Sequence, residues 1–147
     1  MPIHVVEDDL FSLNAHTIVN PVNCVGVMGK GLAKQFARRF PDHEVWYKRQ
    51  CADGLIVPGC PQLDRGSAPW ILAFPTKAHW RDPSRAEWIR EGLISCRRRL
   101  PGSGVLSLAM PALGCGLGGL PFDQVRQMTE RYLGDLTMPI WLIPPQE

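Results

Sequence analysis

Hydrophobic positions along the chain fall into two kinds of pattern. Short β-branched or apolar runs predict strands at residues 3–6, 17–20, 70–74, 105–110 and 139–143. Longer stretches between them repeat apolar residues at helical spacing and predict helices over 31–40, about 44–51, 84–100 and from 121 onward. Strands that alternate with crossover helices indicate an α/β fold, a three-layer α/β/α domain with a mixed central sheet.

Proline, glycine and capping residues predict where the helices begin and end. Pro41 is expected to stop the first helix, and Ser84 with Glu87 forms an S-x-x-E capping box that predicts the start of the third. The stretch 57–69, rich in Pro, Gly and Asp, is interpreted as a surface excursion. The expected inward residues are Leu32, Phe36 and Phe40 in the first helix, Ile89, Leu93, Cys96 and Leu100 in the third, and Phe122, Val125, Met128 and Tyr132 in the last.

Size and composition narrow the class of protein. A chain of 147 residues has the usual size of one compact domain, so we expect a single domain over 1–147. The net charge of +2 is too small to indicate nucleic-acid binding by overall charge, so any such binding must come from local patches. The five cysteines are scattered without a C-x-x-C pair, which argues against a disulfide framework or a metal site and favours a reducing cytoplasm. No segment has the length and apolarity of a signal peptide or membrane span.

Two glycine-rich segments carry the strongest chemical signal. Residues 19–31 and 111–120 each follow a predicted strand and precede a predicted helix. Glycine lets backbone N–H groups approach an anion, and two such loops at the carboxyl ends of strands meet at one crevice, where a diphosphate would fit. A role in packing alone is the alternative for either loop. Neither segment has the Walker or G-x-G-x-x-G spacing, so ATP and NAD are disfavoured and no cofactor is expected.

Four segments together resemble one family. In chain order VVEDDL, TIVNPVNCVGVMGKGLAKQF, FPTKAHW and MPALGCGLGGL are similar to the macrodomain family, and within it to the branch of DNA ADP-ribosyl glycohydrolase antitoxins and terminal ADP-ribose protein glycohydrolase. The resemblance covers nearly the whole chain. It implies a macrodomain fold, ADP-ribose as the ligand, and removal of ADP-ribose from a modified target.

The resemblance also assigns roles to individual residues. Asp9, with Asp8 as the neighbouring possibility, would read the adenine amino group, because a carboxylate accepts from an exocyclic amine. Asn23 would bind the distal ribose, while Asn20 would tie down the loop backbone. Lys30 is either a phosphate counter-charge or a solvated lysine. The rest of the expected ADP-ribose site is Leu10, Val27, Met28, Gly29, Gly31, Pro75, Thr76, Gly114, Cys115, Gly116, Leu117, Gly118 and Gly119. Cys24 and Cys115 are interpreted as small structural residues rather than nucleophiles.

FPTKAHW supplies the candidate catalytic groups. Similar glycohydrolases carry their catalytic lysine at the position of Lys77, although a surface lysine is the ordinary alternative. In neutral form its amine could attack the anomeric carbon of the distal ribose and displace the modified group through a lysyl adduct. His79 is the second candidate, for proton transfer or for contact with the departing base, with a simple hydrogen-bonding role as its alternative.

The choice of target depends on two features. The protein-directed relative carries an aspartate where this chain has Gly118, and its absence favours the DNA-directed branch. Trp80 and Arg81 are an aromatic and a basic residue side by side, a pair that can hold the bases and phosphates of single-stranded DNA, and basic side chains of the first two helices could extend the track. The alternative is that Trp80 packs in a surface groove and that the helix charges are only solvated. Those side chains are Lys34, Arg38, Arg39, Lys48 and Arg49.

The expected partners are therefore ADP-ribose, ADP-ribosylated single-stranded DNA and a cognate toxin ADP-ribosyltransferase. No association with a membrane is expected. Two alternatives stay open. A non-catalytic ADP-ribose-binding module would share both loops but would have no use for Lys77. A hydrolase of ADP-ribosylated protein or of small ADP-ribose derivatives is weakened by Gly118.

Overall fold

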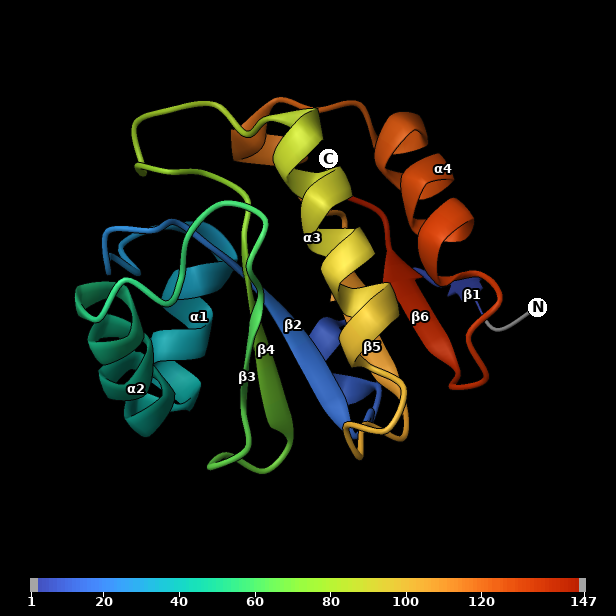
Figure 1. Cartoon of the computed structure of the whole chain (residues 1–147), viewed down its shortest axis with the longest axis horizontal. Coiled ribbons are helices and arrows are strands. Elements are labelled where there is room, and N and C mark those ends of the chain that lie inside the picture. The colour runs from blue at the N-terminus through green and yellow to red at the C-terminus, as the bar shows by residue number, and fades with distance from the viewer. Residues whose placement is uncertain (1–2, 146–147) are drawn as a thin grey trace.

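A mixed sheet forms the centre of the computed structural model, which describes residues 3–145 (Figure 1). The strand order is β1-β6-β5-β2-β4-β3. Neighbouring strands from β1 to β4 in this order are parallel, and only the β3–β4 pair is antiparallel. The strands are β1 (Ile3–Val5), β2 (Thr17–Val22), β3 (Gln62–Asp64), β4 (Trp70–Pro75), β5 (Leu108–Pro111) and β6 (Ile140–Ile143).

The helices agree with the apolar spacing in the sequence. They are α1 (Gly31–Arg39), α2 (Pro41–Ala52), α3 (Ala86–Arg99) and α4 (Phe122–Leu133), and short 3-10 turns cover Leu10–Ser12 and Gly116–Gly118. Helix α1 ends before Pro41, as predicted. Helix α2 begins at Pro41 rather than near Glu44, because proline is well suited to the first turn of a helix, where its missing N–H is not needed.

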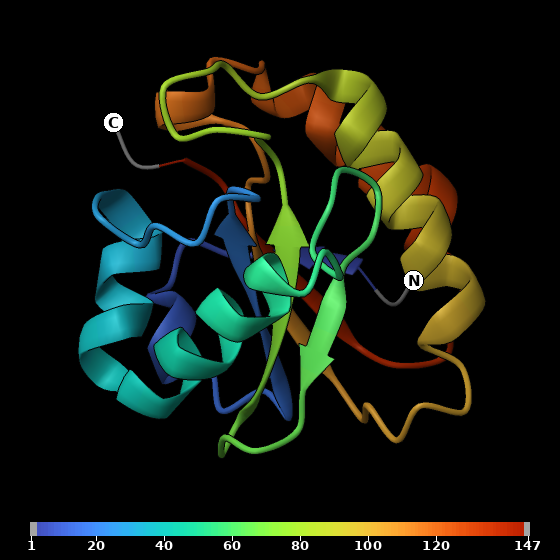
Figure 2. The same cartoon turned by 60° about the vertical axis from the view of Figure 1, so that its left-hand side comes forward.

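Each strand sends alternate side chains to opposite faces of the sheet. Val19 and Leu72 lie in the core beneath α3 and α4, together with the predicted inward residues of those helices. Ile18 and Ile71 lie in the core on the other face, where Phe36 of α1 packs, and α2 adds its own apolar cluster there. Figures 1 and 2 show these helices on both sides of the sheet, which confirms the three-layer α/β/α fold.

Two local predictions were wrong. The capping box does not form: α3 begins at Ala86, its N-cap is Arg85, and no side chain caps it. The Ser84 side chain is instead buried against the loop after β5. The 57–69 excursion contains strand β3, in which Leu63 pairs with Leu72 of the neighbouring strand β4. Its three residues are too few to give an alternating pattern in the sequence.

The parallel strands gather three long loops at one end of the sheet. The segments that follow β2, β4 and β5 all lie at the upper end of the molecule in Figures 1 and 2. Open α/β sheets bind their ligands at this edge. Within residues 3–145, no helix is both long enough and apolar enough to cross a membrane.

Candidate functional site

Three segments build the candidate site. We call residues 23–30, between β2 and α1, loop 1; residues 112–121, between β5 and α4, loop 2; and residues 76–85, between β4 and α3, the lysine segment. Each follows the carboxyl end of a parallel strand. The sheet therefore brings together the two glycine-rich sequences and FPTKAHW, as the sequence predicted.

Loop 1 is shaped by the side chain of Asn23. The Asn23 Nδ2 donates to the Val27 carbonyl at 2.8 Å, and its Oδ1 accepts from the Val25 N–H at 3.0 Å. The hydroxyl of the buried Tyr47 lies 2.8 Å from both the Oδ1 and the backbone oxygen of Asn23. The role expected of Asn20, tying down the loop backbone, is therefore carried out by Asn23. Tyr47 was not found from the sequence, although its spacing from His43 and Cys51 places all three on one side of α2.

Asn20 instead belongs to a buried polar chain. Its Nδ2 donates to His43 Nε2 at 3.1 Å, and His43 Nδ1 donates to Asp64 Oδ2 at 2.8 Å. All three side chains are buried, and burial lowers the pKa of His43 below its usual 6.5. The neutral imidazole can then accept from Asn20 while it donates to Asp64. These hydrogen bonds tie β2, α2 and β3 together beneath loop 1. The prediction that Asn20 ties down the loop backbone is therefore wrong.

The exposed end of loop 1 leads directly into α1. Val27, Gly29, Lys30 and Gly31 are exposed, whereas the Met28 side chain is buried against Tyr47. No side chain caps the first turn of α1. Free N–H groups at a helix start attract an anion, so this end can receive a phosphate through its backbone.

The lysine segment is fixed to β2 on one side of Lys77 and to loop 1 on the other. The Thr76 N–H donates to the Val22 carbonyl at 2.9 Å, and the Cys24 N–H donates to the Ala78 carbonyl at 3.2 Å. The Lys77 side chain is half-buried and takes part in none of the salt bridges within residues 3–145. Its backbone is therefore held while its amine stays available.

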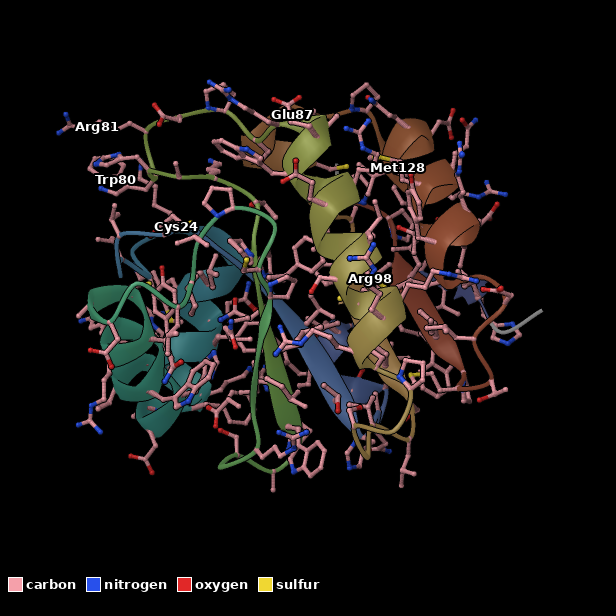
Figure 3. The ribbon with its side chains drawn as sticks, in the orientation of Figure 1. Cys24, Trp80, Arg81, Glu87, Arg98 and Met128 are labelled. Carbon is pink, nitrogen blue, oxygen red and sulfur yellow. The ribbon has the colours of Figure 1, made fainter. Side chains whose placement is uncertain are left out.

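His79, Trp80 and Arg81 form an outer lip on this segment. The Arg81 N–H donates to His79 Nδ1 at 3.1 Å, and the rings of His79 and Trp80 lie 5.2 Å apart. The Arg81 guanidinium stacks over the Trp80 ring at 4.7 Å. Figure 3 shows Trp80 and Arg81 projecting from the rim of the molecule, and Trp80 is 42% exposed. The lip offers an aromatic face with an adjacent positive charge, and Nε2 is the His79 ring nitrogen left outside this turn.

Loop 2 depends on backbone shapes that favour glycine. Gly114, Gly116 and Gly119 have φ angles of 74°, 63° and 82°. A side chain added at Gly116 or Gly119 would meet no atom within 4 Å, so both positions face open space. The Gly116–Gly118 turn begins without a side-chain cap. This loop presents backbone groups, because none of residues 112–121 has a charged side chain. The side chain of Leu117 lies outside the described part of the structure.

Gly118 differs from the other glycines of loop 2. A Cβ on Gly118 would lie 3.0 Å from Ser84 Cβ and closer still to Ser84 Oγ. A side chain at this position would therefore point toward the lysine segment rather than into the open space in front of Gly116 and Gly119. A side chain at position 118, such as that of aspartate, would compete for the space that Ser84 occupies.

The remaining predicted residues occupy three environments. Asp8 and Asp9 are exposed after β1, at the same sheet edge, and Asp9 caps no helix with its carboxylate. Leu10 and Thr76 are buried, as is Pro75, so any contact of these three with a ligand would be limited. Burial raises the pKa of the Cys24 thiol to about 11 and raises that of Cys115, which supports the interpretation that neither is a nucleophile.

Two of the five basic side chains predicted to extend the DNA track contact other side chains of this protein. Arg39 lies 4.1 Å over the Phe11 ring, and Lys48 is 4.0 Å from Glu44. Lys34, Arg38 and Arg49 are exposed on α1 and α2. The structure therefore places these five residues on the helices beside loop 1, but not at the lip.

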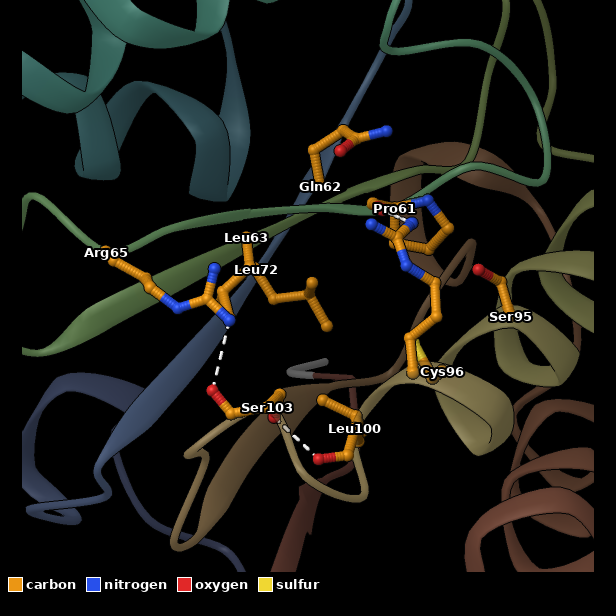
Figure 4. Close-up of a pocket in the computed structure, with 10 residues that line it drawn as sticks. Pro61, Gln62, Leu63, Arg65, Leu72, Ser95, Cys96, Leu100 and Ser103 are labelled. Carbon is orange, nitrogen blue, oxygen red and sulfur yellow. Dashed lines mark hydrogen bonds between the residues drawn. The ribbon is translucent and has the colours of Figure 1, made fainter.

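A separate hollow of about 160 Å³ lies between β3, β4 and the C-terminal half of α3 (Figure 4). Arg65 and Arg99 both line it, and each donates to a backbone carbonyl, of Ser103 and Pro61 respectively. None of the predicted site residues lines it. The hollow is therefore distinct from the edge that holds both glycine loops.

Comparison with known proteins agrees with this arrangement. The Macro domain family matches residues 19–129. A Thermus aquaticus protein named DNA ADP-ribosyl glycohydrolase is 42% identical over 147 residues, which cover 97% of this chain and 41% of that protein. A Thermosipho africanus DNA ADP-ribosyl transferase-DNA ADP-ribosyl glycohydrolase fusion protein is 36% identical, covering 99% of this chain and 42% of that protein. The structure of Thermosipho africanus DarTG in complex with ADP-ribose superposes with a TM-score of 0.93 at 38% identity, covering 97% of this chain and 41% of that one. The chain thus spans about two fifths of the length of these relatives.

Proposed function

The chain belongs to the macrodomain family, and from that premise we propose that it binds ADP-ribose and releases it from ADP-ribosylated DNA. In this proposal residues 1–147 act as one macrodomain. The observation that carries the proposal is the position of Lys77. Its neighbours Thr76 and Ala78 are hydrogen-bonded to β2 and to loop 1 respectively, at the sheet edge where loop 2 also lies.

Binding is proposed to rest on backbone groups. The uncapped start of α1 and the open glycines of loop 2 would hold the diphosphate, and the exposed Asp9 carboxylate would accept from the adenine amine. The ADP-ribose complex of the Thermosipho relative supports this choice of ligand.

Catalysis is proposed to start from the neutral Lys77 amine. Its nitrogen would form a bond to the anomeric carbon of the distal ribose while the glycosidic bond to the DNA base breaks. The departing base would take up a proton, for which His79 Nε2 is the candidate donor. Water would then cleave the lysyl adduct, which releases ADP-ribose and restores the amine.

The DNA target is supported by the lip and by Gly118. The Trp80 face and the Arg81 guanidinium offer stacking and phosphate contact to a single strand. Ser84 fills the space that a carboxylate at position 118 would need, which disfavours chemistry that depends on such an acid. The Thermus relative's name supports DNA as the target, and the fusion in Thermosipho supports an ADP-ribosyltransferase as the partner whose product this chain removes.

A substrate comparison tests the proposal. The protein should release ADP-ribose from an ADP-ribosylated single-stranded oligonucleotide, and more slowly or not at all from ADP-ribosylated protein. Calorimetry should show binding of free ADP-ribose. Binding without release from either substrate would leave an ADP-ribose-binding module, whereas faster release from protein would replace DNA as the target.

A further inference from the structure

Ser84 joins the lysine segment to loop 2. The Ser84 N–H donates to the Gly118 carbonyl at 3.1 Å, and the Ser84 side chain is only 6% exposed. Its Cβ lies 3.1 Å from where a Cβ on Gly114 would stand and 3.0 Å from the equivalent point on Gly118. The side chain of Ser84 is thus enclosed by two glycines of the loop.

The lysine segment is therefore tied at both ends. At its start, Ala78 accepts a hydrogen bond from loop 1, and at its end, Ser84 is packed against loop 2. Lys77 lies beside the first attachment, and the lip, with half-buried His79 and exposed Trp80 and Arg81, lies between the two.

We infer that Ser84 is a positioning residue. Its small side chain fits against Gly118, which has no side chain, and this contact holds the lysine segment against loop 2. The contact thereby sets the position of Lys77 relative to a ligand bound at loop 2. This inference rests on the proposed function of Lys77 and loop 2. Ser84 itself need not touch the substrate, because its side chain is only 6% exposed. Its contribution is the contact between the lysine segment, which carries the reacting amine, and loop 2, which binds the ligand.

A purely structural role for Ser84 would give a different result. If Ser84 only filled space, enlarging Gly118 would lower the stability and leave turnover per folded molecule unchanged. If Ser84 positions Lys77, the same change should lower kcat, while the affinity for free ADP-ribose changes little. Displacement of a reacting group by about 1 Å is enough to slow a reaction by roughly a hundredfold.

The experiment uses paired variants and measures kcat, KM and the ADP-ribose Kd below the melting temperature. Gly118→Ala should lower kcat by at least about tenfold with Kd changed by less than about threefold. Ser84→Gly, which opens the space beside position 118, should restore kcat when combined with Gly118→Ala. Gly134→Ala is the matched control, because its Cβ would overlap the Glu130 backbone at the far end of α4. It should lower stability without changing kcat.

Limited trypsin digestion gives a readout that does not depend on activity. Arg81 and Arg85 are exposed cleavage sites on the lysine segment. Gly118→Ala should speed cleavage there, Gly134→Ala should not, and the double variant should return to the wild-type rate. Equal kcat losses in Gly118→Ala and Gly134→Ala, failure of the Ser84→Gly rescue, or unchanged cleavage would overturn the inference. A wild-type protein that releases no ADP-ribose would contradict the proposed function instead, and the cleavage pattern would still decide the coupling.

Discussion

The two glycine-rich loops are held in shape by opposite means. Loop 1 is organised from within by polar side chains, because Asn23 bonds to Val25 and Val27 and is itself held by the buried Tyr47 hydroxyl. Loop 2 is organised by the absence of side chains, with left-handed Gly116 and Gly119 in open space and Gly118 closed against Ser84.

This difference separates two ways of losing ligand binding. Damage to loop 1 should remove hydrogen bonds from the folded core and so reduce stability and affinity together. Damage to the open side of loop 2 should block the ligand with a smaller loss of stability. Two loops that look alike in sequence are therefore expected to respond differently to substitution.

The largest loss of stability is expected from Asn23→Ala. The change removes the side-chain acceptor of the loop 1 N–H groups and one of the two acceptors of the Tyr47 hydroxyl, which should lower the free energy of unfolding by about 2–4 kcal/mol. Loop 1 should lose its shape, and the ADP-ribose Kd should rise by at least about tenfold. Urea unfolding and calorimetry measure the two effects. Tyr47→Phe, which keeps the Asn23 side chain, should lose less of both, and an Asn23→Ala protein of wild-type stability would contradict this description of loop 1.

Gly116→Val should give the reverse balance. A left-handed backbone costs a side chain about 1–2 kcal/mol, and the added atoms would enter the open space where the diphosphate is proposed to lie. The ADP-ribose Kd should therefore rise more than tenfold, by about the same factor or more as in Asn23→Ala, at a smaller cost in stability. If the affinity is unchanged, the phosphate does not bind at this face of loop 2.

The smallest effect concerns the buried chain beneath loop 1. Burial lowers the pKa of His43 below 6.5, so the folded protein resists a proton that the unfolded chain accepts. Stability from this source is complete above about pH 6.5 and declines as the pH falls toward the lowered pKa. The urea concentration at the unfolding midpoint should decrease as the pH is lowered from about 7 to about 5. The same decrease should be smaller in His43→Gln. Equal decreases would mean that the contact of His43 with Asp64 and Asn20 carries no such linkage.

How much the sequence predicted depended on the range of the interaction. Helix faces and strands were predicted because apolar periodicity is local, as in Ile89, Leu93 and Cys96 of α3. The gathering of the three loops followed from the order of strands and helices. The role of Asn20 was misassigned and the part that Asn23 plays in shaping loop 1 was missed, because both depend on α2, whose His43 and Tyr47 approach them only in the fold.

Ser84 shows the same limit at the other loop. Its local motif predicts a helix cap, yet its position is decided by Gly118, thirty-four residues away in the chain. A capping box is a short-range pattern, and a contact with a distant loop replaced it. The closed side of loop 2 could therefore be recognised only from the structure.

The most direct test of the central claim, that loops bind while Lys77 reacts, is one experiment on Lys77→Ala and Lys77→Arg. Both variants should bind free ADP-ribose within about threefold of the wild-type Kd, because backbone groups carry the binding. Both should release ADP-ribose from a modified oligonucleotide at least about a thousandfold more slowly, since neither alanine nor a guanidinium supplies a neutral amine. Substantial release by Lys77→Arg would contradict the covalent mechanism, and full activity of Lys77→Ala would remove Lys77 from the chemistry altogether.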